Sequence, residues 1–254
     1  MSQTMKDVKA ITIPEGSVKK IEDSNGNMIW GSYDAYPYRL LEYIDIPADA
    51  YINLNDTPGS GLGYYLDVNL NLNDDTFTAT GYPFGSIYIN GSSYNRYHLG
   101  VSTTDLKAWS AGSTSTNLCA IGDVDERHVI ELNFHTYGDK KAYLDDVNKG
   151  NFTPNSNTSF NSCYLGARHQ LTAPSTEGVS NYAHDMRVYF LQSRISASGL
   201  SKFYPAQRRS DGKVGLLKIY NDGASVRFCT SETSTELIAG TVVNEYFTGT
   251  SWPA

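Results

Sequence analysis

The sequence has no long apolar run. No stretch reaches the roughly 20 residues that a membrane-spanning helix needs, so we expect no membrane insertion. The opening residues, MSQTMKDVKA, also lack the apolar core of a secretory signal peptide. We therefore expect synthesis in the cytoplasm, without an obvious route of export.

Cysteine is scarce, and histidine shows no metal-binding pattern. The 3 cysteines, Cys119, Cys163 and Cys229, lie far apart without C-x-x-C spacing, which predicts neither a disulfide framework nor a zinc site. We expect reduced thiols, with Cys163 packed as a small apolar residue in a strand-like run. The 5 histidines lack metal-ligand spacing, and the alternation around His128 predicts a histidine at the edge of the core.

Charged residues are also few, at 19% of the chain, and their net charge is −7. An acidic chain does not favour a phosphate-binding surface, so we expect no nucleic-acid partner. We interpret the basic residues that cluster late as a solvated face balancing acidic loops; the alternative is a patch for an acidic polysaccharide or a partner protein. These residues are Arg187, Arg194, Lys202, Arg208, Arg209, Lys213 and Lys218.

Catalytic motifs are missing as well. The sequence has no G-x-S-x-G nucleophile elbow and no phosphate-binding glycine loop. The nearest match to the paired carboxylates of a glycosidase is the run from Asp123 to Glu126. In a strand, Asp123 and Asp125 would share a face while Glu126 would point away. The run is more typical of a turn. We expect no catalytic residues and no enzyme activity.

What the sequence does contain is typical of β-structure. It has 19 Tyr and 22 Gly, with many Asn, Ser and Thr, a mixture that favours strands joined by many turns. Apolar and polar residues alternate over 66–72 and over 128–134, where Ile130, Leu132 and Phe134 are expected to face inward. No segment of useful length shows helical spacing. These patterns predict an all-β sandwich or barrel.

Further strand signals occur along the chain, separated by turn residues. The strand at 141–144 is expected to pair with 128–134 through a turn at 137–139, and residues 150–161 are expected to form a polar loop. The other predicted strands are 85–91, 96–101, 106–109, 162–167 and 182–192.

The stretch 187–220 is predicted to close the sheet as a strand, a loop and a strand. It begins with a β-branched and aromatic run, and it ends in an apolar run at 214–217 after the Ser-Asp-Gly turn at 210–212. Between them lies Pro205, which cannot donate to a ladder. We therefore expect Pro205 to end a strand or to lie at a sheet edge.

This stretch also carries a family resemblance. Its F-x-P-A-x-R-x-S-D-G segment, followed by G-L, resembles the end of a laminin-G-like, concanavalin-A-type jelly-roll domain found in tail and other virion proteins of phages that infect gut bacteria. Residues 41–44 and 50–53 resemble the start of that domain, and its middle strands resemble 127–131, 142–145 and 164–167. The pieces occur in the expected order over residues 39–221. The resemblance implies an antiparallel jelly-roll β-sandwich in a virion protein.

Two smaller parts flank this predicted domain. Residues 1–38 predict a small β-meander with a hairpin at Asn25-Gly26, followed by a linker. The meander resembles assembly segments of phage tail-associated proteins, and it is too small to be stable alone. It therefore needs a partner surface, which is either another chain or its own domain. Residues 222–254 carry strand signals beyond the usual end of the family pattern, and they either add strands or form an arm that contacts a neighbour.

A sugar site on this fold would use aromatic faces and polar side chains at the rim of the sandwich. The stretch 94–98 and Trp109 supply them, and our candidate carbohydrate-binding residues are Tyr94, Arg96, Tyr97 and Trp109. Tyr64 and Tyr65 come next. The alternative is that these aromatic residues simply pack, since a chain with 19 tyrosines must cluster some of them.

Calcium is a separate question, because many domains of the resembling family bind it through loop oxygens. The acidic pairs Asp74-Asp75 and Asp145-Asp146 could serve, although acidic pairs in turns commonly serve the turn itself. Calcium stays open and unassigned, and no other metal or cofactor is expected.

Together these observations predict a phage virion structural protein, made in the cytoplasm of a bacterial host. It would display a lectin-like jelly roll for attachment to a host-surface glycan, as a homo-oligomer beside other virion proteins. One alternative is a purely structural role, as capsid decoration or as a tail or baseplate component. A glycosidase and a bacterial cell-surface binding protein are less favoured, the latter because a signal peptide is missing.

Overall fold

A computed structural model of the chain describes most of its length. The described residues are 20–22, 28–31, 37–56, 63–72, 80–110, 115–133, 140–151, 162–173, 176–180, 185–194, 199–221 and 225–247. They form an all-β structure, as the composition predicts, with one short 3₁₀ helix, η3 (Ile121–Asp123), among them. Within these ranges no helix has the length and apolar character needed to cross a bilayer. Outside them lie Phe134, the turn at Asn25-Gly26 and the turn expected at 137–139.

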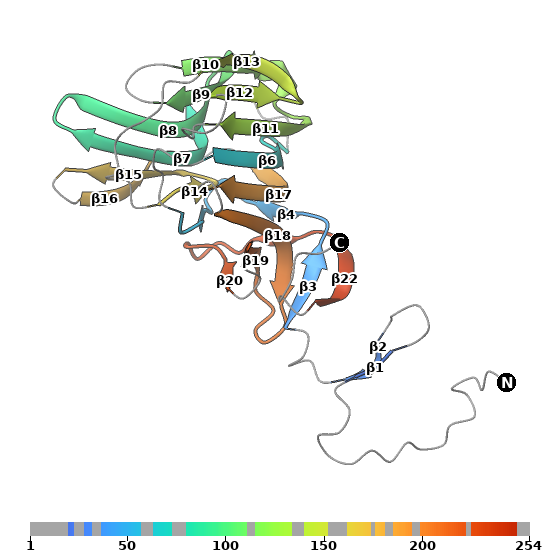
Figure 1. The fold of residues 1–254 in the computed structure, drawn as a ribbon. Coiled ribbons are helices and arrows are strands. Elements are labelled where there is room, and N and C mark those ends of the chain that lie inside the picture. Colours follow the sequence, from blue (N-terminus) through green and yellow to red (C-terminus); the bar gives the residue numbers. More distant parts are fainter. Residues whose placement is uncertain are drawn as a thin grey trace, which may run out of the picture.

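The smaller of the two main sheets has eight strands (Figure 1). Its path runs through β10 (Ser115–Ala120), β9 (Asp105–Ser110), β8 (Ser93–Val101), β7 (Gly81–Asn90), β14 (Tyr164–Leu165) and β5 (Ile52–Asn53). A hairpin of β15 (Arg168–Thr172) and β16 (Thr176–Ser180) joins this sheet beside β7. The β15–β7 pair is parallel, whereas the other pairs of the sheet are antiparallel.

The larger sheet has twelve strands. Its path runs through β13 (Val147–Asn151), β12 (Lys141–Leu144), β11 (Arg127–Asn133), β6 (Gly63–Asn69), β17 (Met186–Arg194), β18 (Leu200–Arg208), β19 (Val214–Tyr220) and β20 (Val226–Cys229). Beside this path, β4 (Ile44–Ile46) pairs with β17 and β21 (Ile238–Ala239), and β3 (Tyr38–Leu41) pairs with β18 and β22 (Val242–Phe247).

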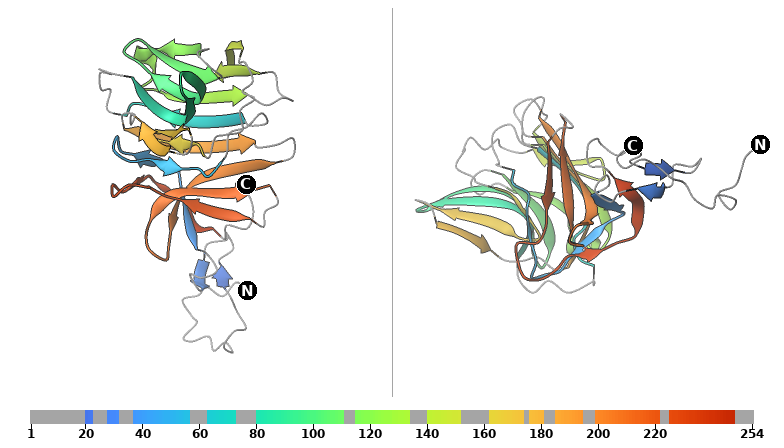
Figure 2. Two further views of the ribbon diagram at one scale, coloured as in Figure 1. Left: turned by 90° about the vertical axis from the view of Figure 1, so that its left-hand side faces the viewer. Right: turned by 90° about the horizontal axis from the view of Figure 1, so that it is seen from below.

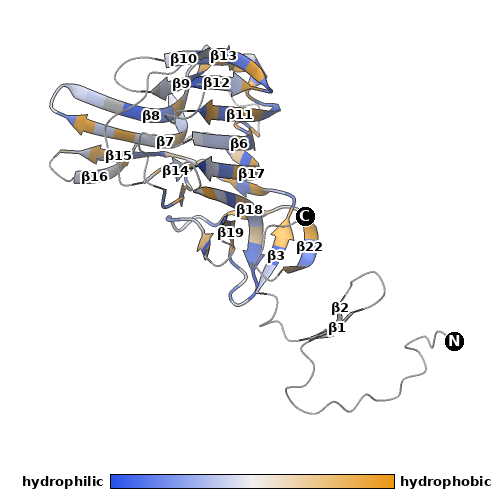
Figure 3. Ribbon diagram, in the orientation of Figure 1, coloured by the Kyte–Doolittle hydropathy of each residue, from blue (hydrophilic) through white to orange (hydrophobic). Residues whose placement is uncertain are grey.

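The two sheets pack face to face as a sandwich around one main core (Figure 2, right). Strands of both sheets interleave hydrophobic and hydrophilic residues (Figure 3). Because side chains alternate along a strand, each sheet turns an apolar face towards the core. In β6, Leu66 and Val68 are buried while Asp67 and Asn69 are only partly covered, as the alternation predicts. In β11, Ile130 and Leu132 face the core in the same way.

The stretch 187–220 contains three antiparallel strands rather than a strand, a loop and a strand. β18 runs through Pro205 with neighbours on both sides, so the prediction that Pro205 ends a strand or lies at an edge is wrong. On one side β17 pairs only as far as Phe203, and β3 begins to pair at Ala206. Pro205 lies where this side of β18 passes from β17 to β3, so its missing N–H breaks no ladder bond to either strand.

Several other strands differ from the prediction. β10, β13, β15 and β16 were not predicted, and β13 extends to Asn151 inside the expected polar loop. The strand expected over 162–167 is limited to β14. β13 is exposed on both faces, as is most of β16, so these strands carry no alternation of apolar and polar residues that a sequence could reveal.

The two ends of the chain add strands in different ways. β1 (Lys20–Glu22) and β2 (Met28–Gly31) form an antiparallel pair, as the hairpin signal predicts, and within the described ranges they join no other strand. The C-terminal strands β20, β21 and β22 are part of the larger sheet, where they pair with β19, β4 and β3. The domain boundaries at 38 and 221 stay predictions.

Gly85 provides a test of how closely β7 and β8 approach each other. Its φ is +124°, and a Cβ atom there would lie 2.2 Å from the carbonyl oxygen of Tyr97. We expect Gly85→Ala to lower the free energy of unfolding by about 2 kcal/mol or more, because it adds both a clash and backbone strain. Gly178→Ala in β16 is the control, since no atom lies within 4 Å of its added Cβ. Urea unfolding curves measure both, and equal effects would contradict the description.

Candidate functional site

Strand β8 divides its side chains between two faces of the smaller sheet. Tyr97, Leu99 and Val101 belong to the main core. Because side chains alternate along a strand, Arg96 and His98 point to the opposite face, away from the larger sheet. This outer face is where the candidate site lies.

Neighbouring strands extend the outer face with aromatic rings. Trp109 of β9 lies directly opposite His98 in the ladder, with ring centroids 5.9 Å apart. Tyr82 of β7 meets the other side of His98 edge to face at 4.9 Å. On β15, the guanidinium of Arg168 lies 3.6 Å from the centre of the Tyr82 ring. Rings and charges therefore follow one another across four strands.

The other end of this arrangement is open to solvent. The guanidinium of Arg96 lies 4.9 Å from the ring centre of Trp109 and 5.1 Å from that of Tyr94. Tyr94 is 42% exposed, whereas His98 and Arg168 are buried. We call the whole set the aromatic–arginine row: Arg168, Tyr82, His98, Trp109, Arg96 and Tyr94.

A glycine lets the rings of the row come together. Gly100 lies on the same face of β8, and a Cβ atom there would be 3.3 Å from Nε1 of Trp109 and 3.5 Å from the ring of Tyr82. An added Cβ atom would therefore press on the indole of Trp109 and lie in ordinary contact with the ring of Tyr82. The absence of a side chain lets Tyr82 and Trp109 cover the strand between them.

The row is positively charged within an acidic chain. Burial, followed by the charges of Arg168 and Arg96, holds the pKa of His98 well below its usual value, so its imidazole is neutral at pH 7. Both guanidinium groups keep their charge. Arg96 forms no ion pair in the described part of the chain, where the arginines that do are Arg39, Arg127, Arg187, Arg208 and Arg209.

The structure brings together three of the four candidate residues. Tyr94, Arg96 and Trp109 lie in the row, on the face of the sheet rather than on rim loops. Tyr97 does not, because it is 1% exposed and packs in the core against Tyr64 and Phe84. Tyr64 is also in the core, and Tyr65 packs edge to face against Phe190 of the larger sheet.

Sequence reasoning missed Tyr82 and Arg168. Tyr82 precedes the first strand residues that were predicted for β7, and Arg168 begins a strand that was not predicted at all. Arg168 reaches the row only because β15 lies beside β7 in parallel register. No local sequence pattern predicts that two segments so far apart in the chain will pair.

The late basic residues do not form one solvated face. Lys218 is fully buried, which makes that interpretation wrong for it, because alternation in β19 turns Lys218 inward with Leu216. Others pair with acids: Arg187 with Asp45, Arg208 with Asp211 and Arg209 with Glu245.

A hollow of about 520 Å³ lies beside these ion pairs. It is lined by Arg39, Arg208 and Arg209, among others. Arg39 and Arg209 both contact Glu245, and Arg208 contacts Asp211. Because acids already neutralise most of this charge, the hollow is a weaker anion site than the aromatic–arginine row.

The other chemical candidates serve the fold. Both carboxylate oxygens of Asp145 are engaged, one by the amide of Val129 and one by Nδ1 of His128 at 2.7 Å. His128 is buried at the core edge, as expected. The run from Asp123 to Glu126 forms the end of η3 and a turn.

Within the described ranges no three His, Cys, Asp or Glu side chains cluster as metal ligands, and Asp74-Asp75 lie outside them. All three cysteines are free thiols, and Cys163 is buried as predicted.

Comparisons with known proteins leave the row as the main functional observation. The chain matches no protein-family model, no curated protein and no solved structure. Chemically, the row offers a partly exposed indole and phenol as flat apolar surfaces. Beside them stands a guanidinium that can pair two oxygens of an anion.

The buried, neutral state of His98 predicts how stability depends on pH. Its folded-state pKa is depressed, so the unfolded chain binds an extra proton as the pH falls below about 6.5, and stability is lost there. We expect His98→Gln to lose less stability than the wild type between pH 7.5 and 5.5. The difference is up to about 1.4 kcal/mol for each pH unit below 6.5.

Urea unfolding at the two pH values measures this slope. His128, whose folded-state pKa is raised, and His169, whose pKa is lowered, contribute equally to both proteins and cancel in the comparison. Parallel losses in wild type and His98→Gln would show that His98 is not kept neutral by the fold.

Proposed function

We propose that this protein binds a carbohydrate carrying acidic groups on the outer face of its smaller sheet. The observation that carries the proposal is the aromatic–arginine row, which combines four flat rings with two guanidinium groups across four strands. Sugar rings present apolar C–H faces that stack on aromatic side chains, and Trp109 and Tyr94 supply such surfaces at the open end.

The positive charge of the row favours a sugar that carries an acidic group. The chain as a whole has a net charge of −7, so it repels polyanions over most of its surface. At the row, Arg96 has no acidic partner within the described part of the chain, and its planar fork matches a carboxylate or sulfate oxygen pair. A sugar bearing such a group, stacked on Trp109, satisfies both features at once.

We propose further that the protein is a phage virion component displaying this domain towards a host surface. Support for the virion setting comes from the ordered resemblance over 39–221. The β-sandwich is compatible with the jelly-roll, concanavalin-A-type arrangement that this resemblance implies, and we propose that finer class for it. The alternative is a purely structural capsid decoration or tail component in which the row binds nothing.

A glycan panel tests the proposal if it pairs uronate-containing oligosaccharides with their methyl-ester forms. We expect binding to the free acids, weaker binding to the esters, and a loss of about tenfold or more in affinity on Arg96→Gln, corresponding to about 1.4 kcal/mol. Trp109→Ala is expected to weaken both ligand forms, because it removes the stacking surface.

Arg227→Gln is the matched control, since Arg227 is exposed on β20 of the larger sheet and its loss changes the net charge equally. Affinity unchanged by Arg96→Gln, or lowered equally by Arg227→Gln, would refute the site. An absence of binding to the whole panel would favour the structural alternative.

We also propose that the protein assembles as a homo-oligomer through its C-terminal strands. Ile238 of β21 and Val243 of β22 are 57% and 62% exposed, and Val242 beside them is also exposed. Exposed aliphatic side chains that follow one another so closely along the chain favour a surface that a partner covers. Light scattering is expected to give a multiple of 28.0 kDa, lowered by Val243→Lys but not by Val147→Lys on β13. A 28.0 kDa particle at every concentration would contradict this.

A further inference from the structure

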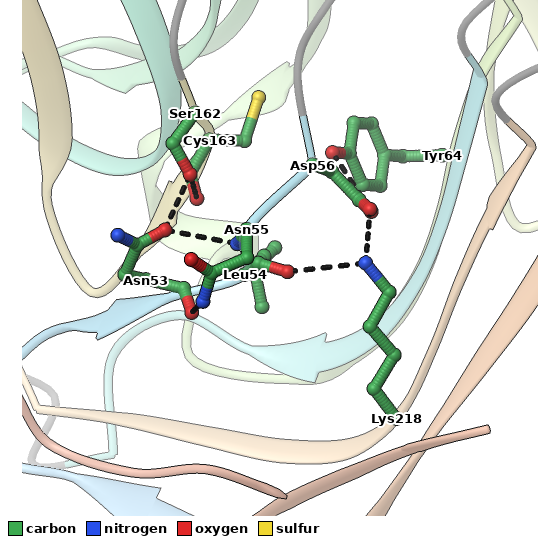
Figure 4. A network of polar contacts seen from close by, with 8 residues as sticks. All are labelled: Asn53, Leu54, Asn55, Asp56, Tyr64, Ser162, Cys163 and Lys218. Carbon is green, nitrogen blue, oxygen red and sulfur yellow. Dashed lines mark hydrogen bonds and ion pairs between the residues drawn. The ribbon is translucent and has the colours of Figure 1, made fainter. Parts of the chain in front are cut away.

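A lysine and an aspartate meet in the middle of the sandwich (Figure 4). Nζ of Lys218, on β19 of the larger sheet, contacts Oδ1 of Asp56, which follows β5 of the smaller sheet. The two side chains are 1% and 2% exposed. Nζ also donates to the carbonyl oxygen of Leu54 at 3.3 Å. The pair therefore joins the two sheets from inside the core.

Both backbones are fixed, so the contact is not the result of two loose side chains meeting. Lys218 stands in register with Phe203 on one side and with Arg227 on the other. The segment after β5 is held by two backbone bonds, from the amide of Leu54 to Cys163 and from the amide of Cys163 to Asp56. These ladders hold the amine and the carboxyl group against each other.

The surroundings of the pair are largely aromatic. Nζ lies 5.1 Å from the ring centre of Phe203 and 4.9 Å from that of Tyr220. The hydroxyl of Tyr64 lies 3.4 Å from Oδ2 of Asp56, and the Tyr64 ring itself packs against Phe84. Two full charges are costly in such a place, whereas passing one proton from Nζ to the carboxylate leaves a neutral amine beside a neutral acid.

We propose that Lys218 and Asp56 condense to form an isopeptide bond that covalently joins the two sheets. The lone pair of Nζ attacks Cγ of Asp56 and forms the C–N bond, and the C–Oδ1 bond breaks. The hydroxyl oxygen of the acid leaves with a proton from Nζ as one water molecule. An ammonium and a carboxylate thus become an amide and water, a balanced change that needs no oxidant, metal or co-reactant.

Two features favour this step over a permanent ion pair. Well-oriented intramolecular partners react as if present at about 10⁵–10⁸ M, and the exclusion of water also opposes the reverse hydrolysis. Tyr64 donates a hydrogen bond to Oδ2, the oxygen that carries the developing negative charge in the tetrahedral intermediate. Burial raises the pKa of Tyr64 well above its usual value, so the phenol keeps the proton that it donates. Tyr64 therefore acts as a catalytic residue in this reaction.

The intact mass of the folded full-length chain tests the bond directly. We expect a mass about 18 Da below that of the sequence, because one water has left. A protease digest should then contain one branched peptide that joins the segments carrying Asp56 and Lys218. Lys218→Arg and Asp56→Ala should each show the unmodified mass of their own sequence.

The location of the loss decides the outcome. Asp211-Gly212 and Asp222-Gly223 can also lose one water by closing to a succinimide, and tandem mass spectrometry of the digest separates these sites from the cross-link. A loss confined to these Asp-Gly pairs, or an unmodified wild-type mass, would overturn the proposal and leave Lys218–Asp56 as an ion pair. This result needs only the wild-type chain, so it does not depend on whether a variant folds.

A time course assigns the role of Tyr64. In freshly synthesised chain, mass loss followed against time should be slower for Tyr64→Phe than for the wild type, because the hydrogen bond to Oδ2 is missing while the ring remains. Tyr97→Phe is the matched control, since it removes one hydroxyl from a second buried core tyrosine, whose ring packs edge to face against that of Tyr64. Equal rates in the three proteins would remove Tyr64 from the reaction.

Discussion

The contact between Lys218 and Asp56 is the interaction on which the sandwich depends most. It is buried on both sides and connects β19 of the larger sheet with the segment after β5 of the smaller one. Before the two groups react, leaving one charge without its partner would cost roughly 3–5 kcal/mol, which favours the packing of the two sheets that brings the groups together. The aromatic side chains around it then complete the core on both sides.

Because the core lies between the two sheets, the outer face of the smaller sheet is available for binding. The same strand that sends Tyr97 and Leu99 inward sends Arg96 and His98 outward. Across β15, β7, β8 and β9 these outward side chains become a continuous row of rings and guanidinium groups. A single constraint, the alternation of β8, thus separates the residues that hold the fold from those proposed to bind.

Much of the fold could be predicted from the sequence, because strands with one buried face alternate visibly, as 66–72 does. Three features could not. β18 can contain Pro205 because one of its sides passes from β17 to β3 at that residue. Lys218 can be buried because Asp56 contacts it. Arg168 reaches the row because β15 pairs in parallel with β7. Each arises from contacts between distant segments. Alternation alone would have separated Tyr97 from Arg96, although both were proposed as sugar ligands.

The central claim is that an acidic sugar stacks on Trp109 beside Arg96. The chain has 3 tryptophans, so its indole N–H groups give a small set of NMR signals that mutation can assign. On titration with a uronate oligosaccharide, the account predicts that the Trp109 signal shifts and saturates while the other two stay in place. It also predicts that the methyl-ester form shifts the signal less. A Trp109 signal that does not move while the protein binds the sugar would contradict the account, because binding would then take place elsewhere.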